Sequence, residues 1–237
     1  MESKEKVCVF GYNFKHWKTQ AGILNLTLSG FKPDHVILQD WKQLNIPKPL
    51  VRITPNNLYL IEPTKLLQSL GIPYTISDHN SPDSIATLAE GGFSLGVILG
   101  ARILSGEVIE QFEKGILNLH PGLLPENRGL DTIKWAILKN QQQGVTAHLI
   151  DDKIDRGLLV SKEEIKIYND DTLLDLYIRI VNLEQEMLVK AVRSILTGKF
   201  VSKSFLPKGE YNSFMGPEDE QVVVEMFSHY KNCFFKE

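Results

Sequence analysis

The feature that most constrains the fold is a series of short apolar runs separated by helical patterns. The runs are VCVFGY (7–12), HVILQD (35–40), SLGVILG (94–100) and ILNLH (116–120). Such runs are typical of strands that are buried on both faces, as in parallel sheets covered by helices. Between the first two runs, Trp17, Ala21, Leu24 and Leu28 recur at helical spacing. We therefore predict an α/β, Rossmann-like fold with a mostly parallel sheet flanked by helices.

The last third of the sequence changes character. An apolar stripe from Leu173 to Ile195 predicts one long amphipathic helix over 171–196, started by Asn169 or Asp170 and ended at Gly198. The remaining residues are rich in turn formers and then helical. We predict a main domain over 1–198 and a small C-terminal appendage over 199–237, which would contact a substrate or a second subunit.

The overall charge argues for small-molecule partners. The sequence has 26 basic and 29 acidic residues, without a long block of one sign. The near balance of charge gives no strong positive electrostatic potential that would attract nucleic acid or an anionic membrane. Because the sequence shows neither a signal peptide at its start nor a run of 18 apolar residues, we expect a cytoplasmic protein without membrane contact.

Cysteine and histidine spacing gives no support for a metal or disulfide site. The two cysteines, Cys8 and Cys233, lie near opposite ends of the chain and are expected to be reduced thiols. The six histidines show none of the short paired spacings of zinc sites. We predict no metal.

The segment LNLHPGLLPENRG (117–129) contains the strongest candidate site. Side chains alternate along a strand, so Asn118 and His120 share one face while Leu117 and Leu119 share the other. Pro121 ends the strand, and in open α/β sheets ligands bind where strands end. A strand-end histidine is commonly a structural hydrogen-bonding group. Here, however, an amide donor and an imidazole converge, a pair that suits acyl transfer through a tetrahedral intermediate.

The same segment resembles a known family. Residues 118–129 match the pattern Asn-x-His-Pro-x-Leu-Leu-Pro-x-x-Arg-Gly of the folate-dependent formyltransferases. ILGARILS (98–105) and GVTAHLIDDKIDRG (144–157) also look like segments of that family, and the resemblance covers about 64–198. It implies transfer of a formyl group from N10-formyltetrahydrofolate, the expected co-substrate, to an amine.

The resemblance also implies roles for individual residues. Asn118 and His120 would stabilise the oxyanion, His120 would move the proton, and Asp155 would orient His120. From the residues alone, Asp155 before Arg156-Gly157 would instead be interpreted as a turn former. His148 shares a strand face with Thr146 and is interpreted as a packed, hydrogen-bonded histidine, with a substrate role as the alternative.

Folate contacts are implied on two segments, mostly through the backbone. One is formed by Arg102, Ile103 and Leu104, and the other extends from Ile150 through Asp151 to Lys153. The residues alone leave alternatives open, since the two apolar side chains of the first segment also suit a core and its arginine a surface ion pair.

The acceptor amine is inferred mainly by elimination. Glycinamide ribonucleotide formyltransferases have a Gly-Ser-Asn phosphate loop after the first strand, where this sequence reads FGYNFKHWK. Lys15 and Lys18 can attract phosphate there, but a solvated pair of lysines beside a core Trp17 is the favoured alternative. Methionyl-tRNA enzymes carry a further C-terminal domain for tRNA, for which we expect no room here.

The nucleotide-sugar N-formyltransferases are therefore the most similar group. We expect a dTDP-linked 3-amino- or 4-amino-dideoxyhexose as acceptor, with glycinamide ribonucleotide as the alternative. Trp17, Asn80, Arg128 and Tyr211 are candidate acceptor contacts, although Arg128 can instead tie down its loop and Tyr211 can pack across a homodimer. A formyltetrahydrofolate hydrolase and a non-catalytic binding module remain as rival classes.

Overall fold

The computed structural model describes residues 5–43, 46–55, 58–151, 155, 157–201 and 204–235. The helices are α1 (Trp17–Leu28), α2 (Pro63–Leu70), α3 (Pro82–Gly91), α4 (Gly106–Ile109), α5 (Thr132–Leu138), α6 (Leu173–Leu196) and α7 (Pro217–Phe234). The strands are β1 (Val7–Tyr12), β2 (His35–Gln39), β3 (Tyr74–Ile76), β4 (Leu95–Ile98), β5 (Ile116–His120), β6 (Arg128–Gly129), β7 (Gly144–Leu149), β8 (Leu158–Glu164) and β9 (Tyr211–Asn212).

Seven strands form one sheet in the order β3-β2-β1-β4-β5-β7-β8. The first five in this order are parallel, whereas β7 is antiparallel to β5 and β8 is antiparallel to β7. The structure thus confirms the prediction of a mostly parallel, Rossmann-like sheet. The order reverses between β1 and β4, and such a switch point opens a ligand crevice beyond the carboxyl ends of the strands.

Alternate residues of each strand serve two separate cores. On one face, Val9, Leu117 and Leu119 join a large cluster with side chains of α1, α2 and α6. On the other face, Phe10 and Ile116 join a smaller cluster covered by α3 and α4. Asn118 and His120 lie on this second face, because they continue the alternation of Ile116.

The long helix α6 begins later than expected. Thr172 is its N-cap, and Thr172 and Asp175 form a reciprocal capping box. The expected start at Asn169 or Asp170 was therefore wrong, because the capping box provides two backbone hydrogen bonds that those residues do not. The predicted apolar stripe is confirmed: Leu176, Ile180, Met187, Ala191 and Ile195 are buried, and Leu173 and Leu183 are half-buried against the same core.

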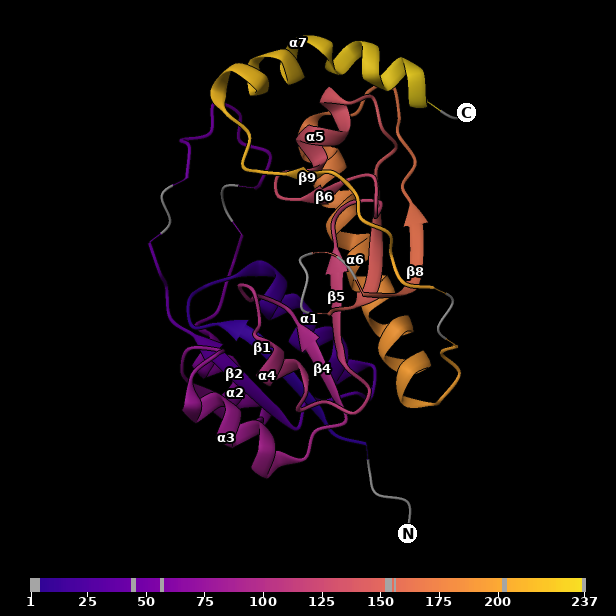
Figure 1. Ribbon diagram of the computed structural model, residues 1–237. Helices are drawn as coiled ribbons and strands as arrows, with labels where there is room; N and C mark the ends of the chain where they lie inside the picture. Colours follow the sequence, from indigo (N-terminus) through magenta and orange to yellow (C-terminus); the bar gives the residue numbers. More distant parts are fainter. Residues whose placement is uncertain are drawn as a thin grey trace.

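The C-terminal segment packs onto the rest of the molecule. β9 pairs in parallel with β6 as a small second sheet. Figure 1 shows α7 crossing the end of the molecule above α5, and its Val223 and Tyr230 are buried in the large core cluster. Among the helices of the described part of the chain, none has the length and apolar composition that crossing a bilayer requires.

Candidate active site at the end of strand β5

Asn118 and His120 lie at the carboxyl end of β5 with their side chains on the same face. His120 is only 4% exposed, and Asn118 is half-buried. The antiparallel pairing with β7 places His148 directly opposite Asn118, and Thr146 opposite His120. The sheet therefore gathers an amide, two imidazoles and a hydroxyl at one position.

Both ring nitrogens of His120 face oxygen acceptors. Nδ1 lies 3.3 Å from Oδ1 of Asp155, and Nε2 lies 2.8 Å from the backbone oxygen of Asn127. A neutral imidazole has one N–H and satisfies only one of these acceptors, whereas the protonated ring satisfies both.

Asp155 occupies a left-handed backbone conformation, with φ of 48°. Its Oδ2 accepts a 2.8 Å hydrogen bond from the backbone N–H of Gly129, and its Oδ1 faces His120. Burial by itself raises the pKa of this carboxyl. The hydrogen bond and charge of His120, with the Gly129 N–H, outweigh burial and hold the pKa below its ordinary value. Asp155 is thus a carboxylate at neutral pH.

The amide of Asn118 is oriented by its neighbour on β7. Its Nδ2 lies 3.2 Å from Nε2 of His148, so the amide donates to the ring and keeps a second N–H for a ligand. His148 is fully buried. The interpretation of His148 as a packed, hydrogen-bonded residue agrees with this position, although its contact with Asn118 was not anticipated.

The loop after β5 is held by buried polar groups. The hydroxyl of Thr146 donates to the carbonyl of Gly122 at 2.7 Å and accepts from the N–H of Leu124 at 3.0 Å. The side chain of Asn127 donates to the carbonyl of Thr132 at 2.7 Å. The backbone oxygen that faces His120 is thereby fixed. Sequence reasoning missed Asn127 because its role depends on its carbonyl rather than on its side-chain type.

The segment Arg102–Leu104 follows β4 beside the site. Leu104 is buried in the α3/α4 core, whereas Ile103 is 64% exposed. The guanidinium of Arg102 donates to the carbonyl of Lys42 at 2.8 Å. Asn80 clamps this segment, since its amide donates to the carbonyl of Ile103 at 2.9 Å and accepts from the N–H of Ser105 at 2.8 Å. Its side chain therefore shapes the loop.

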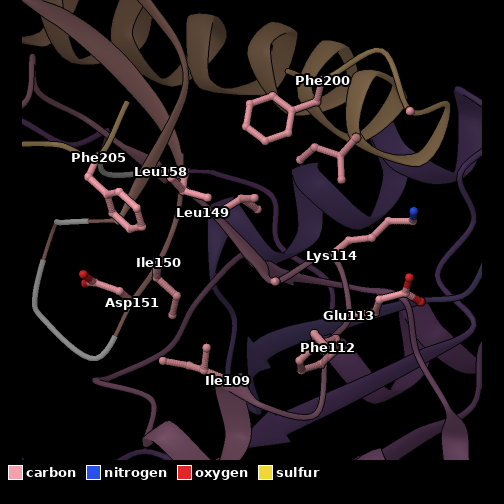
Figure 2. Close-up of a pocket in the computed structure, with 14 residues that line it drawn as sticks. Ile109, Phe112, Glu113, Lys114, Leu149, Ile150, Asp151, Leu158, Phe200 and Phe205 are labelled. Atoms are coloured by element: carbon pink, nitrogen blue, oxygen red, sulfur yellow. The ribbon is translucent and has the colours of Figure 1, made fainter. Parts of the chain in front are cut away.

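The second expected folate segment lines a cavity of about 460 Å³. Ile150 and Asp151 form part of its wall (Figure 2), together with apolar side chains from α4, β7, β8 and the end of α6. The N–H of Ile150 bonds to the carbonyl of Ile116. Asn118 is two residues further along β5, about 7 Å away. Lys153 lies outside the described residues.

Two of the four acceptor candidates are brought together. β6–β9 pairing places Arg128 opposite Tyr211, with the guanidinium carbon 5.8 Å from the ring centre. Arg128 also donates to the carbonyl of Gly209 at 3.1 Å, which ties down the loop. Trp17 is the half-buried first residue of α1 and lies apart, on another element.

Lys15 and Lys18 were expected to be solvated, which is correct for Lys15 and wrong for Lys18. Lys15 is exposed and pairs with Glu62 at 3.4 Å. Lys18 instead points into the protein, where its Nζ lies 2.7 Å from Glu184 Oε1 and 2.7 Å from the carbonyl oxygen of Leu119. Glu184 is 166 residues away on α6, so no local pattern reveals this pair. Among the described residues, no group of three potential metal ligands is close enough to bind an ion.

Comparisons with known proteins point to one family. Residues 78–192 match the family model described as formyl transferase. The methionyl-tRNA formyltransferase of Flavobacterium johnsoniae is 31% identical over 148 residues, 62% of this chain and 43% of that protein. The dTDP-4-amino-4,6-dideoxyglucose formyltransferase of Mycobacterium bovis is 33% identical over 96 residues, 40% and 41% of the two chains. The chain thus spans less than half the length of these relatives.

A solved structure extends the likeness to nearly the whole chain. The N-formyltransferase of Helicobacter canadensis, in complex with folinic acid and dTDP-3-aminofucose, matches with a TM-score of 0.66 at 19% identity. The match covers 95% of this chain and 82% of that one. At this level of identity it shows a shared fold alone.

Proposed function

We propose that the protein transfers a formyl group from N10-formyltetrahydrofolate to an amino sugar, because residues 78–192 match the formyl transferase family model. The acceptor would be a dTDP-linked 3-amino- or 4-amino-dideoxyhexose. The observation that carries the proposal is the convergence of Asn118, His120 and Asp155 at the end of β5.

The residues suit each step of the transfer. The amine attacks the formyl carbon, a C–N bond forms, and the carbonyl becomes an oxyanion. The neutral ring of His120 would take the proton of the attacking nitrogen. The protonated ring and the second N–H of Asn118 would then stabilise the oxyanion. His120 would give the same proton to N10 as the C–N10 bond breaks and tetrahydrofolate leaves, and Asp155 would hold the ring in place in both states.

The cavity beside Ile150 and Asp151 would receive the pteridine ring. Its apolar walls suit a flat heterocycle, and the backbone groups of a strand end suit the ring's polar edge. The cavity is lined by Asp151 and Gly157, which flank Asp155 in the sequence, and by Lys114 and Gly115 before the amino end of β5. A folate bound there would have to extend past Asp155 to reach Asn118 and His120 at the carboxyl end of β5. We include Arg102, Ile103, Leu104 and Lys153 in the proposed folate contacts.

The choice of an amino sugar as acceptor rests on the relatives and on the charge of the chain. The relative from M. bovis is named for a dTDP-4-amino sugar, and the H. canadensis structure contains a dTDP-3-amino sugar. The near balance of 26 basic and 29 acidic residues argues against a tRNA acceptor. Arg128 and Tyr211 offer a cation and an exposed ring for a sugar phosphate. Trp17 and Asn80 are weaker candidates, and the amide of Asn80 already holds the loop after β4.

We also propose that the protein is cytoplasmic and that it forms a homodimer. Cys8 and Cys233 are both free thiols, as is usual in the reducing cytoplasm. A homodimer that involves Tyr211, which is 45% exposed, remains a prediction.

The deciding experiment combines an acceptor panel with a site variant. Purified protein and N10-formyltetrahydrofolate would be incubated with 3-amino and 4-amino dTDP-hexoses, with glycinamide ribonucleotide, and without an amine. We expect tetrahydrofolate release only with an amino sugar. Release without any amine would indicate a hydrolase, and formylation of the ribonucleotide alone would overturn the proposed acceptor.

The variant Asn118→Ala should reduce kcat about a hundredfold to a thousandfold, because it removes an oxyanion donor. Gln221→Ala, which removes an exposed amide on α7, is the matched control and should leave kcat unchanged. Equal turnover by the two variants would remove Asn118 from the mechanism.

A further inference from the structure

Three aromatic rings gather at the carboxyl ends of β1 and β2. The rings of Tyr12 and Phe14 are stacked, with centres 4.8 Å apart and planes at 16°. Trp41 meets Phe14 edge-on at 5.3 Å and is 63% exposed. We call Tyr12, Phe14 and Trp41 the aromatic cluster. It leaves a large indole open to solvent beside rings that are already fixed, which is the arrangement of a stacking platform.

The cluster lies at the switch point of the sheet. β1 ends at Tyr12 and is adjacent to β4, where the strand order reverses. The ring of Tyr12 packs on Gly100, just beyond β4, so closely that a side-chain carbon added there would lie 2.7 Å from it. Aromatic rings thus fill the position where a phosphate-binding fold usually places a glycine-rich turn.

The distance to the reactive groups suits a nucleotide sugar. β5 is two strands away from β1 and three away from β2. At about 4.8 Å per strand, the cluster lies about 10–14 Å from the line of Asn118 and His120. A hexose, a diphosphate and a pentose separate the reacting amine from the base in such a substrate. Glycinamide ribonucleotide has no nucleobase to place there.

Cationic side chains lie next to the cluster. The Arg102 guanidinium donates to the carbonyl of Lys42, the residue after Trp41. Lys42 carries its own charge at the surface, paired with the exposed Asp78. Burial raises the pKa of the Tyr12 hydroxyl, while the positive charge of Arg102 opposes that rise. A diphosphate between the cluster and β5 would therefore pass near Arg102, on the loop after β4.

We propose that the aromatic cluster binds the nucleobase of a nucleotide-linked acceptor, with Trp41 stacking on the base. The inference rests on the proposed function, since it assigns the part of that site which holds the nucleotide. It also adds a binding role to the segment between β1 and α1, whose sequence lacks a phosphate loop.

The test uses dTDP and UDP alone, titrated into the full chain by isothermal calorimetry. Loss of one stacked ring should weaken binding about 5- to 150-fold, so Trp41→Ala should raise the Kd by that factor. Trp41→Phe keeps a stacking face and should restore most of the affinity. Tyr59→Ala, which removes another exposed ring, is the matched control and should bind like the unchanged protein.

A second readout separates this inference from the proposed reaction. In Trp41→Ala, the KM for the amino sugar should rise while the KM for formyltetrahydrofolate stays constant. Equal dTDP affinity in Trp41→Ala and the unchanged protein would overturn the inference, as would a wild-type protein that binds neither nucleotide. Binding of dTDP that depends on Trp41, without formylation of any amino sugar, would uphold the nucleotide site and refute the proposed acceptor.

Discussion

The pair of Lys18 and Glu184 supports β5, the strand of Asn118 and His120, on the face covered by α1 and α6. The last pair between β4 and β5 is Ile98 with Asn118, so the carbonyl of Leu119 lies one residue beyond the end of that ladder. Lys18 donates to this carbonyl at 2.7 Å and to Glu184 at 2.7 Å. On the β4 side the carbonyl of Leu119 is thus held by a lysine of α1, while β7 pairs with the other side of the same segment.

Replacement of Lys18 by methionine should be strongly destabilising. The side chains of Lys18 and Glu184 are 23% and 6% exposed, so the change leaves a buried carboxylate and a backbone carbonyl without their donor. Breaking a buried ion pair from one side costs about 3–5 kcal/mol. For a chain of this size each kcal/mol lowers Tm by about 2–4 °C, which gives a fall of about 6–20 °C.

The assay is urea unfolding, followed by circular dichroism, with a thermal scan of the same variants. The matched control is Lys15→Met, which breaks the exposed pair with Glu62 on the same segment and should cost less than about 1 kcal/mol. The double change Lys18→Met with Glu184→Leu should recover most of the lost free energy, because it removes the stranded charge. If Lys18→Met costs no more than Lys15→Met, the inferred support of β5 is refuted.

Three further outcomes are expected. The lowered pKa of Asp155 contributes stability that is fully present above the ordinary carboxyl pKa of about 4 and is lost as the pH falls through the lowered pKa. In urea titrations, the free energies of unfolding of the wild type and Asp155→Asn should therefore differ at about pH 6, and the difference should shrink as the pH falls below about 4. Gly129→Ala should lower stability by roughly 1–3 kcal/mol and reduce kcat, because φ is 101° and the new carbon would lie 2.1 Å from the Asn212 oxygen; an unchanged Tm would contradict this close approach. Glu220→Ala leaves Lys134, which is 5% exposed, without its buried partner and should detach α7, seen as faster amide exchange in that helix than in α3.

The fold was predictable because its strands are buried on both faces. Apolar runs such as 7–12 and 94–100 leave few alternatives to a parallel sheet covered by helices. The alternation of side chains along a strand is enough to place Asn118 and His120 on the same face. Strand direction was not predictable for β7, since an apolar run such as 144–149 carries no sign of its orientation. That orientation matters, because it places His148 opposite Asn118.

The partners of the site were harder to predict for a different reason. Asp155 reaches His120 only because the chain turns back after β7, and the left-handed turn at Asp155 looks like any other turn in the sequence. Lys18 and Glu184 are separated by 166 residues, and each is an ordinary charged residue of a helix. Such contacts depend on the relative placement of elements, which propensity and periodicity do not encode.

The arrangement separates the chemistry from the choice of acceptor. Every side chain that orients Asn118 and His120 from the front lies on β7 or on the loops beside it, within the part of the chain that matches the formyl transferase family. Tyr12, Trp41 and Tyr211 lie outside that part, at the rim of the same sheet edge or on β9. Under the proposed function, changes at Tyr12, Trp41 or Tyr211 would alter which amine is bound without altering the transfer of the formyl group. We therefore predict that variants of Tyr12, Trp41 and Tyr211 change the KM for the amine, whereas variants on β5 and β7 change kcat for every amine tested.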